Sequence, residues 1–351
     1  QGLKSVGDII DYTPGVTNSQ GEGHRDAAVI RGMRTTQDFY RDGVRDDVQY
    51  YRPLYNVEQV EIIRGPDALL SGFGGAYGII NRVSKKGVIG EDFTTLSGSV
   101  DTFGEHNVQL DKNMQLNDST ALRVNVFGEN LENHRDFYYG DGFGINPTLM
   151  YDLGDENSLS ISYEYLGQER FIDRGIPTGA DNKPVESLKD IVFGDASENY
   201  STHEAHIFRA LLEKQLTDDI LGRLRLTHND HDKLYQNFYA YSWDETAATA
   251  ELKGYKDTTQ RDTTTLSAEL VGEIEMGGFL HNLIAGFEYI DTENKNDRYM
   301  SDFYPISGIG GSVTAYDFTI SRSMINRGTN GVVLNNYMTD LNDMSTAEVS
   351  I

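Results

Sequence analysis

Apolar and polar residues alternate along most of the chain after residue 93. Between Leu159 and Tyr165 every second residue is apolar or aromatic, and the residues between them are two serines and a glutamate. Because successive side chains of a strand point to opposite faces, this period of two predicts strands with one apolar and one polar face. The pattern predicts nine strands, near residues 94–102, 106–116, 119–130, 142–151, 157–168, 203–216, 220–232, 260–275 and 279–293, and a tenth from residue 336.

The connections between these strands alternate in length. Tight turns are expected at 117–118, 154–157, 217–219 and 277–278, and long polar loops at 132–141, 169–201, 233–258 and 294–334. Short turns at one end and long loops at the other are typical of an outer-membrane barrel. A soluble β-sandwich gives the same alternation, but its strands run ~5–6 residues, whereas a tilted membrane strand needs ~9–11. Strand length therefore favours a membrane β-barrel of antiparallel transmembrane strands.

Nine or ten strands do not close a barrel of this kind. An open sheet edge in lipid leaves backbone N–H and C=O groups unpaired, which costs free energy at every residue. We therefore expect the remaining strands to lie beyond Ile351.

The first ninety residues follow a different pattern. A short helix is expected over 6–12, because Val6, Ile9 and Ile10 share one face, and Pro14 ends it. An Asp-Gly hairpin is expected at 42–43, followed by a helical turn at 57–59 and strands at 60–63 and 79–83. The pattern predicts a small α+β domain over 1–90 and a barrel segment over 91–351.

Composition and charge exclude several classes of function. The 351 residues carry 55 acidic and 30 basic side chains, for a net charge of −25, and a nucleic-acid partner requires clustered Lys and Arg instead. There is no cysteine, which excludes disulfides, thiolate metal sites and a cysteine nucleophile. No apolar run reaches ~18 residues, so no transmembrane helix is expected. The first residues also lack the features of a signal peptide. The strand-like segment 347–351 stops without a turn, so we expect the sequence to be a fragment.

No arrangement of residues indicates catalysis or a metal site. Serine, histidine and aspartate occur without a nucleophile-elbow pattern, so we expect no enzyme. His203 and His206, like His228 and His231, are three residues apart and should point to opposite faces of a strand. The Gly-rich stretch 72–78 lacks the βαβ context that makes such a loop bind phosphate.

Five short motifs in the first ninety residues occur in order and at a characteristic spacing. Together they closely resemble the plug domain of TonB-dependent siderophore receptors: Asp-Ile-Ile-Asp-Tyr-Thr-Pro-Gly-Val at 8–16, Ile-Arg-Gly at 30–32, Asp-Gly-Val-Arg at 42–45, Val-Glu-Ile-Ile-Arg-Gly-Pro at 60–66 and Asn-Arg-Val-Ser-Lys-Lys at 81–86. The segment 46–52 resembles the catecholate-type members more than the ferrichrome-type members. The barrel strands share only their pattern with this family.

The resemblance implies a barrel of about 22 strands that an N-terminal plug closes, as in outer-membrane transporters. It implies a bacterial outer-membrane receptor, in contact with lipid, that binds a ferric siderophore and imports it with energy from TonB. The TonB box precedes the plug in this family and is absent from these residues. Because iron arrives already coordinated by the siderophore, neither a cofactor nor a protein ligand set for metal is expected.

The resemblance also implies which plug residues reach the outer vestibule. Three segments do so in such receptors, around 34–37, 49–52 and 71–77. Arginines there can hold an anionic ferric catecholate, and aromatic residues can offer flat contact surface; each can also be an ordinary loop side chain in water. The predicted siderophore contacts are Arg34, Gln37, Arg45, Tyr50, Tyr51, Arg52, Phe73 and Tyr77. At 71–78 the chain departs from a common Tyr-Gly-Arg-Gly pattern, which leaves the cargo open.

Arg31 and Arg64 have a different expected role. In the family, arginines of these two motifs pair with barrel glutamates and hold the plug in place, and the glutamates are expected beyond the end of this chain. The alternative is pairing within the plug, for example with Glu61. We therefore predict a plug–barrel lock at Arg31 and Arg64.

The sequence is also compatible with two other functions. The same architecture serves cargoes such as haem, cobalamin or a glycan, although His24 is the plug's only histidine, which weakens the haem reading. A non-transporting adhesin or glycan-binding protein would also be rich in strands, but it gives no reason for five ordered plug motifs.

Overall fold

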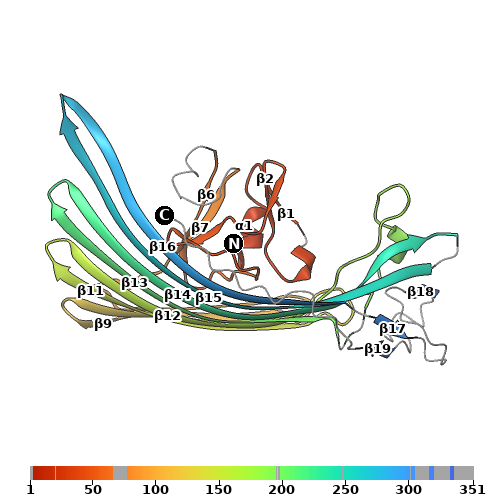
Figure 1. Ribbon diagram of the computed structural model, residues 1–351. Coiled ribbons are helices and arrows are strands. Elements are labelled where there is room, and N and C mark those ends of the chain that lie inside the picture. The colour runs from red at the N-terminus through yellow and green to blue at the C-terminus, as the bar shows by residue number, and fades with distance from the viewer. Residues whose placement is uncertain are drawn as a thin grey trace.

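The computed structural model describes residues 3–19, 21–65, 77–194, 196, 198–246 and 249–300, together with three short strands, β17 (Asp302–Tyr304), β18 (Tyr316–Thr319) and β19 (Val333–Asn335). Long strands form one curved sheet, and the N-terminal domain lies on its concave side (Figure 1). The boundary predicted at residue 90 falls in the connection between β7 and β8.

The N-terminal domain is built from short elements. They are α1 (Val6–Ile10), β1 (Val16–Asn18), the 3-10 turn η1 (Gly21–Gly23), β2 (Ala28–Ile30), β3 (Met33–Thr35), β4 (Phe39–Arg41), β5 (Val44–Arg45), β6 (Val57–Ile63) and β7 (Ile79–Ser84). β1, β2 and β3 form one small sheet, and β5, β4, β7 and β6 form another. Val6, Ile10, Ile30, Phe39 and Ile80 are buried between them and make the domain core.

Local sequence accounts for most of these elements. The backbone N–H of Ser5 donates to Asp8 Oδ2 (2.9 Å) and closes the first turn of α1. Asp42 (φ 52°) and Gly43 (φ 82°) make the predicted two-residue hairpin between β4 and β5. The helical turn predicted at 57–59 was wrong, because β6 begins at Val57 and pairs with β7 through an irregular register there.

The large sheet contains all nine predicted strands in sequence order. They are β8 (Phe93–Val100), β9 (His106–Asn117), β10 (Thr120–Leu131), β11 (Gly140–Gly154), β12 (Asn157–Phe171), β13 (Tyr200–Thr217), β14 (Ile220–Asp244), β15 (Thr249–Met276) and β16 (Phe279–Met300). Each pairs antiparallel with the next. The loop predicted at 233–258 was wrong, because β14 and β15 continue their ladder as far as Asp244 and Thr249. The tenth strand predicted from residue 336 lies outside the described residues.

The two faces of the sheet differ as the alternation predicts. Charged and polar side chains such as Arg123, Asn125 and Glu164 are buried on the concave face, against the N-terminal domain. The convex face carries a band of exposed apolar and aromatic residues, as a surface in contact with lipid requires. The band includes Leu96, Val108, Leu116, Phe143, Leu153, Tyr163, Phe208, Leu216, Leu224, Leu226, Leu266, Leu270, Phe279, Leu283, Phe287 and Tyr289.

The short turns lie at one end of the sheet and the long connections at the other (Figure 1). The connection between β12 and β13 includes the 3-10 turn η3 (Glu186–Leu188), and Leu188 and Phe193 pack on Phe238 of β14. Among the residues described above, no helix is long and apolar enough to cross a membrane.

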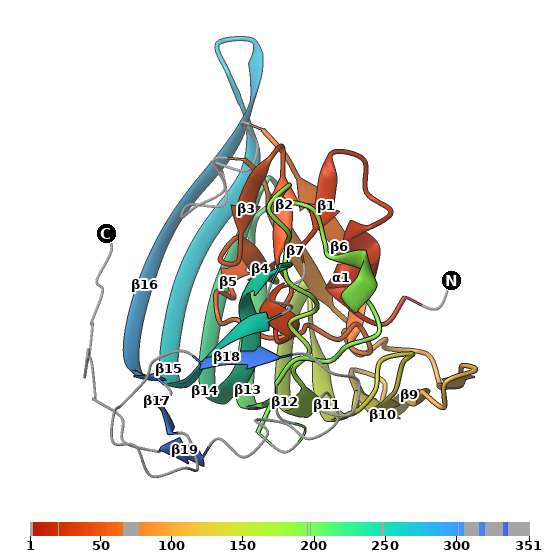
Figure 2. The same cartoon turned by 90° about the vertical axis from the view of Figure 1, so that its right-hand side faces the viewer.

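The N-terminal domain is packed into the trough of the sheet (Figure 2). Val48, Tyr50 and Tyr55 of this domain form one buried cluster with residues from three barrel strands, Phe127, Leu166, Ala205 and Ile207. Apolar burial at this contact supplies a favourable free energy for docking the two parts. The domain therefore fills the trough as a plug.

Candidate functional site

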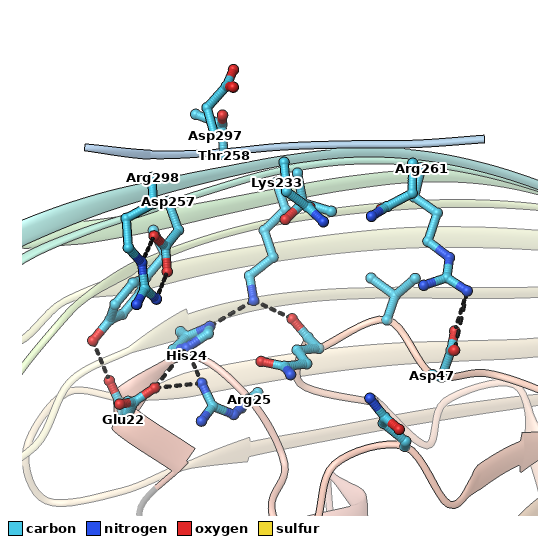
Figure 3. Close-up of a pocket in the computed structure, with 17 residues that line it drawn as sticks. Glu22, His24, Arg25, Asp47, Lys233, Asp257, Thr258, Arg261, Asp297 and Arg298 are labelled. Carbon is cyan, nitrogen blue, oxygen red and sulfur yellow. Dashed lines mark hydrogen bonds and ion pairs between the residues drawn. The ribbon is translucent and has the colours of Figure 1, made fainter. Parts of the chain in front are cut away.

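A cleft of about 680 Å³ lies between the plug and the strands β14, β15 and β16 (Figure 3). This volume is in the range of sites for small-molecule ligands, ~300–1,000 Å³. From the plug it is lined by Glu22, His24, Arg25, Gln37, Asp47, Val48 and Gln49, and from the strands by Lys233, Tyr235, Asp257, Thr258, Thr259, Arg261, Asn294, Asn296, Asp297 and Arg298.

The plug wall of the cleft begins with the turn at Glu22. Glu22 has a positive φ of 58° between two glycines that also have positive φ, so the chain reverses sharply there. The Tyr235 hydroxyl donates to the Glu22 carbonyl oxygen (3.1 Å), and the Tyr255 hydroxyl donates to Glu22 Oε1 (3.3 Å). Arg174, from the long connection after β12, lies 3.4 Å from the same carboxylate oxygen. Two strands and a loop thus hold this plug turn.

His24 connects this turn to β14. Its ring packs against that of Tyr235, with centroids 3.9 Å apart, and its Nδ1 accepts a hydrogen bond from Lys233 Nζ (2.6 Å). Burial holds the pKa of His24 well below 6.5, and the charge of Lys233 acts in the same direction, although Glu22 opposes both. His24 is therefore neutral at neutral pH and can accept this hydrogen bond.

Three carboxylates in the cleft are each paired with an arginine. Arg25 Nη1 lies 2.7 Å from Glu22 Oε2, and Arg261 Nη2 lies 3.0 Å from Asp47 Oδ1. Arg298 binds Asp257 with two hydrogen bonds, of 2.7 and 2.6 Å. The Asp47 pair joins the plug to β15 and is visible in Figure 3. The paired charges make this wall polar without giving it a large net charge.

A buried charge network lies directly below the cleft, inside the plug. Arg52 has no exposed surface, and its guanidinium donates to Asp46 Oδ2 (3.1 Å) and to the carbonyl oxygens of Tyr50 and Val48 (3.1 and 2.6 Å). Arg82 also binds Asp46, and it donates to the Tyr50 hydroxyl (3.0 Å).

Burial alone would raise the pKa of Asp46, but the two guanidinium groups outweigh it and hold this pKa well below 3.8. Burial raises the pKa of Tyr50 to about 12. At neutral pH the network therefore contains the Asp46 carboxylate between two arginines and a protonated tyrosine, and Asp26 Oδ2 lies 3.9 Å from Arg52 Nη1.

The predicted contacts at 34–37 and 45 lie on or near the plug surface. Arg34 is exposed and donates to Ser19 Oγ (2.8 Å). Gln37 lines the cleft, and Arg45 donates to its backbone and side-chain oxygens (3.4 Å each). The structure thus brings Gln37 and Arg45 together beside the cleft. Arg34 instead binds Ser19, which follows strand β1.

The predicted contacts at 50–52 lie deeper than expected. Tyr50 stacks on the barrel residue His203 (ring centroids 4.5 Å apart) and, like Arg52, is buried. The guanidinium of Arg170 lies 4.2 Å from the centroid of the Tyr51 ring, and burial raises the pKa of Tyr51 to about 12. Tyr77 is 42 % exposed, and Phe73 lies outside the described residues.

Arg31 and Arg64 are both exposed, on adjoining turns of the plug. The Arg31 guanidinium lies against Gly65, and Arg64 Nη1 donates to the carbonyl oxygen of Pro14 (2.5 Å). Glu61, their alternative partner, instead accepts from Gln59 and Asn81 (2.8 Å each). Their pairing with barrel glutamates stays a prediction.

The sequence did not single out the residues that hold the plug most closely. Glu22, Asp47, Lys233, Tyr235 and Arg261 make the contacts across the cleft, and their partners lie about 200 residues apart in the chain. No local pattern marks such a pair. The histidines behave as predicted, since His203 and His231 are buried on the concave face and His206 and His228 are on the convex face.

Comparisons with known proteins agree with this architecture. Residues 1–79 match the sequence profile of the TonB-dependent receptor plug domain. Over 313 residues the chain is 28 % identical to the probable TonB-dependent siderophore receptor PiuA of Acinetobacter baumannii, covering 84 % of this chain and 41 % of PiuA. Over 184 residues it is 33 % identical to the catecholate siderophore receptor Fiu of Escherichia coli, covering 51 % of this chain and 24 % of Fiu.

Solved structures show the same fold. The crystal structure of PiuA superposes with a TM-score of 0.80 at 24 % identity, over 99 % of this chain and 50 % of that one. The pyoverdine receptor FpvA of Pseudomonas aeruginosa superposes with a TM-score of 0.81 at 16 % identity, over 98 % of this chain and 50 % of that one. The chain thus spans less than half the length of these curated relatives and about half of the solved receptors.

A plug seated inside antiparallel strands with an apolar outer band is the architecture of a plugged outer-membrane β-barrel. Residues 1–79 match the TonB-dependent receptor plug domain, and the chain is similar to TonB-dependent siderophore receptors, as its five plug motifs predict. These relatives are named as receptors, and a barrel with an apolar outer band is the architecture of bacterial outer-membrane proteins.

Proposed function

We propose that the protein containing this chain binds a ferric siderophore at the outer face of its plug and imports it with energy supplied through TonB. The observation that carries the proposal is the cleft between the plug and β14–β16, because a ligand bound there contacts both parts at once. The residues 1–90 form the plug in this proposal and 91–351 the first part of the barrel. The names of the matched relatives support a siderophore as cargo.

A catecholate siderophore is the cargo class we propose. The relative from Escherichia coli is named as a catecholate receptor, and the cleft offers arginines, Lys233 and the ring of Tyr235 to an anionic, aromatic ligand. Gln37, in the cleft wall, and Arg45, which bonds to it, remain proposed contacts. Arg34, Phe73 and Tyr77 also remain proposed contacts, on the resemblance of their segments. Tyr50, Tyr51 and Arg52 would contribute indirectly, from inside the plug, by positioning the loop that carries Gln49.

Haem is a weaker alternative in this site. His24 is placed in the cleft, but both of its ring nitrogens are already engaged, Nδ1 by Lys233 and Nε2 by Glu22 and Arg25. An axial ligand for haem iron needs one free ring nitrogen. Cobalamin and glycans are left for the binding experiment to distinguish.

The test uses the full-length receptor expressed in a bacterium that lacks its own siderophore receptors. Cells are given radioactive iron as a tris-catecholate complex, and uptake is compared with and without TonB. We expect uptake that requires TonB and that stops when residues 1–90 are deleted. Uptake independent of TonB, or binding that survives removal of the plug, would instead support a pore or an adhesin. Binding of haem or cobalamin in place of the iron complex would overturn the proposed cargo.

A further inference from the structure

Lys233 is a buried lysine at the centre of the cleft. It lies on β14, opposite Thr259 of β15, with its side chain on the concave face and only 7 % exposed. Figure 3 shows it extending from the strands toward the plug, beside His24. Its surroundings differ from those of the other cations in the cleft.

Among the charged residues that line the described cleft, Lys233 has no counter-charge. Glu22, Asp47 and Asp257 each pair with an arginine, as described above. Asp297 points away from the plug. Of the four cations that line the described cleft, only Lys233 has no carboxylate within ion-pair distance. A buried ammonium without a counter-charge is destabilised, so an anion that enters the cleft would gain free energy by binding it.

The same ammonium connects the barrel to two separate plug segments. It donates to His24 Nδ1 (2.6 Å) and to the carbonyl oxygen of Gln49. His24 follows the Glu22 turn, and Gln49 lies between Asp46 and Arg52 of the buried network. Both acceptors are neutral, and neutral acceptors bind an ammonium less strongly than an anion does. An anion can therefore replace either of them.

We propose that Lys233 determines the charge specificity of the cleft, and that an anionic ligand replaces the plug acceptors His24 and Gln49 as the hydrogen-bond partner of the Lys233 ammonium. The inference rests on the proposed function, since it assigns the residue that recognises the negative charge of the cargo. On binding, the plug segments at 22–26 and 47–50 would lose their hydrogen bonds to Lys233.

The first experiment measures binding to the full-length receptor and three variants. The probes are the Fe(III) complex of a tris-catecholate siderophore, a trianion, and that of a tris-hydroxamate siderophore without net charge. For Lys233→Met we expect a loss of about ten- to a hundredfold in affinity for the trianion, the size expected for a charge-assisted hydrogen bond, and no change for the neutral complex. Lys233→Arg should keep most of the affinity, since it keeps the charge.

Lys214→Met is the matched control, because Lys214 is an exposed lysine on the convex face of β13 and its removal changes the net charge equally. It should bind both probes as the wild type does. Equal trianion affinity in wild type and Lys233→Met would overturn the inference, as would an equal loss in Lys214→Met.

A second measurement separates this inference from the proposed cargo. Amide hydrogen exchange at 22–26 and 47–50 is followed in the folded receptor with inorganic pyrophosphate, an anion that is not a siderophore. We expect pyrophosphate to speed exchange there in the wild type and in Lys214→Met, and to have no effect in Lys233→Met. If the wild type binds neither iron complex, the cargo proposal fails, and the pyrophosphate result alone decides the role of Lys233. No change in the wild type, or the same change without Lys233, would overturn it.

Discussion

The guanidinium of Arg52 has no exposed surface, although its position in the sequence predicted a contact in the vestibule. Its donors are used by Asp46 and by backbone carbonyl oxygens of the same loop. Burying this charge is tolerated because a carboxylate and several acceptors surround it. At the scale of single residues, Arg52 was predicted to contact the ligand, but in the structure it is buried and stabilises the loop at 46–52.

Removing the carboxylate from this network should destabilise the plug. In Asp46→Asn, Arg82 loses its ion-pair partner and Arg52 keeps only Asp26, whose Oδ2 lies 3.9 Å from Arg52 Nη1. Leaving buried guanidinium charge uncompensated costs about 3–5 kcal/mol. The measurement is the urea dependence of hydrogen exchange at 39–52 in the folded receptor. Glu293→Gln is the control, because Glu293 forms an exposed pair with Lys295 and should change stability little. Equal effects of the two substitutions would contradict the role assigned to Asp46.

Acidification should loosen the turn that carries His24. The groups around its ring are Glu22 and Arg25 of the plug, with Lys233 and Tyr235 of β14. Because the folded pKa of His24 lies below its unfolded value of about 6.5, the unfolded turn binds more protons. The neutral ring therefore contributes its full stability above pH 6.5, and this contribution falls as the pH drops below that value.

Hydrogen exchange at 22–26, followed from neutral pH to about pH 5, measures this dependence. After correction for the intrinsic exchange rate, protection should decrease with acid in the wild type and change less in His24→Gln. His206→Gln is the control, since His206 is on the convex face beside Tyr163. An acid response that persists without His24 would assign the effect to another group.

At the scale of elements, alternation predicted all nine strands but not their full length. The band in contact with lipid requires apolar residues on one face, and this requirement produces the pattern. Beyond the band, β14 and β15 continue as a ladder of polar and aromatic residues in which neither face is uniformly apolar. Backbone pairing and contacts with the connection after β12 sustain these ends, so the sequence there resembles a loop.

Glycine at 144 shows how one strand makes room for the plug. A Cβ added to Gly144 of β11 would lie 2.5 Å from Phe127 Cε1 and 2.8 Å from the Tyr55 hydroxyl oxygen. Gly144→Ala should therefore displace Tyr55 and destabilise plug docking by about 1–3 kcal/mol, as overpacking does. Gly128→Ala on the neighbouring strand is the control, because a Cβ there meets nothing within 4 Å. Urea unfolding of the plug, read by exchange at 48–56, should separate the two variants.

At the scale of the whole molecule, the short turns and the long connections define two ends of the barrel. In the outer membrane, short turns face the periplasm and long loops face the outside. The 351 residues contain no cysteine, so single cysteines can report this orientation. We expect Lys183→Cys, in the connection after β12, to react in intact cells with a membrane-impermeant maleimide. Asp118→Cys, in the turn after β9, should react only after the membrane is permeabilised, and the reverse result would invert the proposed orientation.

The sequence by itself determined the class of the protein. Strand periodicity depends on which residue faces lipid and which faces the plug, and that is a local property of each strand. The five plug motifs lie within ninety residues, where hairpin and cap chemistry is also local. Both kinds of information can be read without knowing the fold.

Only the tertiary structure decided the site. Lys233 meets His24, Tyr235 meets Glu22 and Arg261 meets Asp47 because the plug docks in one orientation within the trough. Residues more than 200 positions apart carry no common period or spacing, since the docking is set by the packed interface as a whole. The same docking buries Arg52 and leaves Lys233, among the described residues of the cleft, as the cation without an ion-pair partner, because charge pairing depends on distance in space and not on order in the chain.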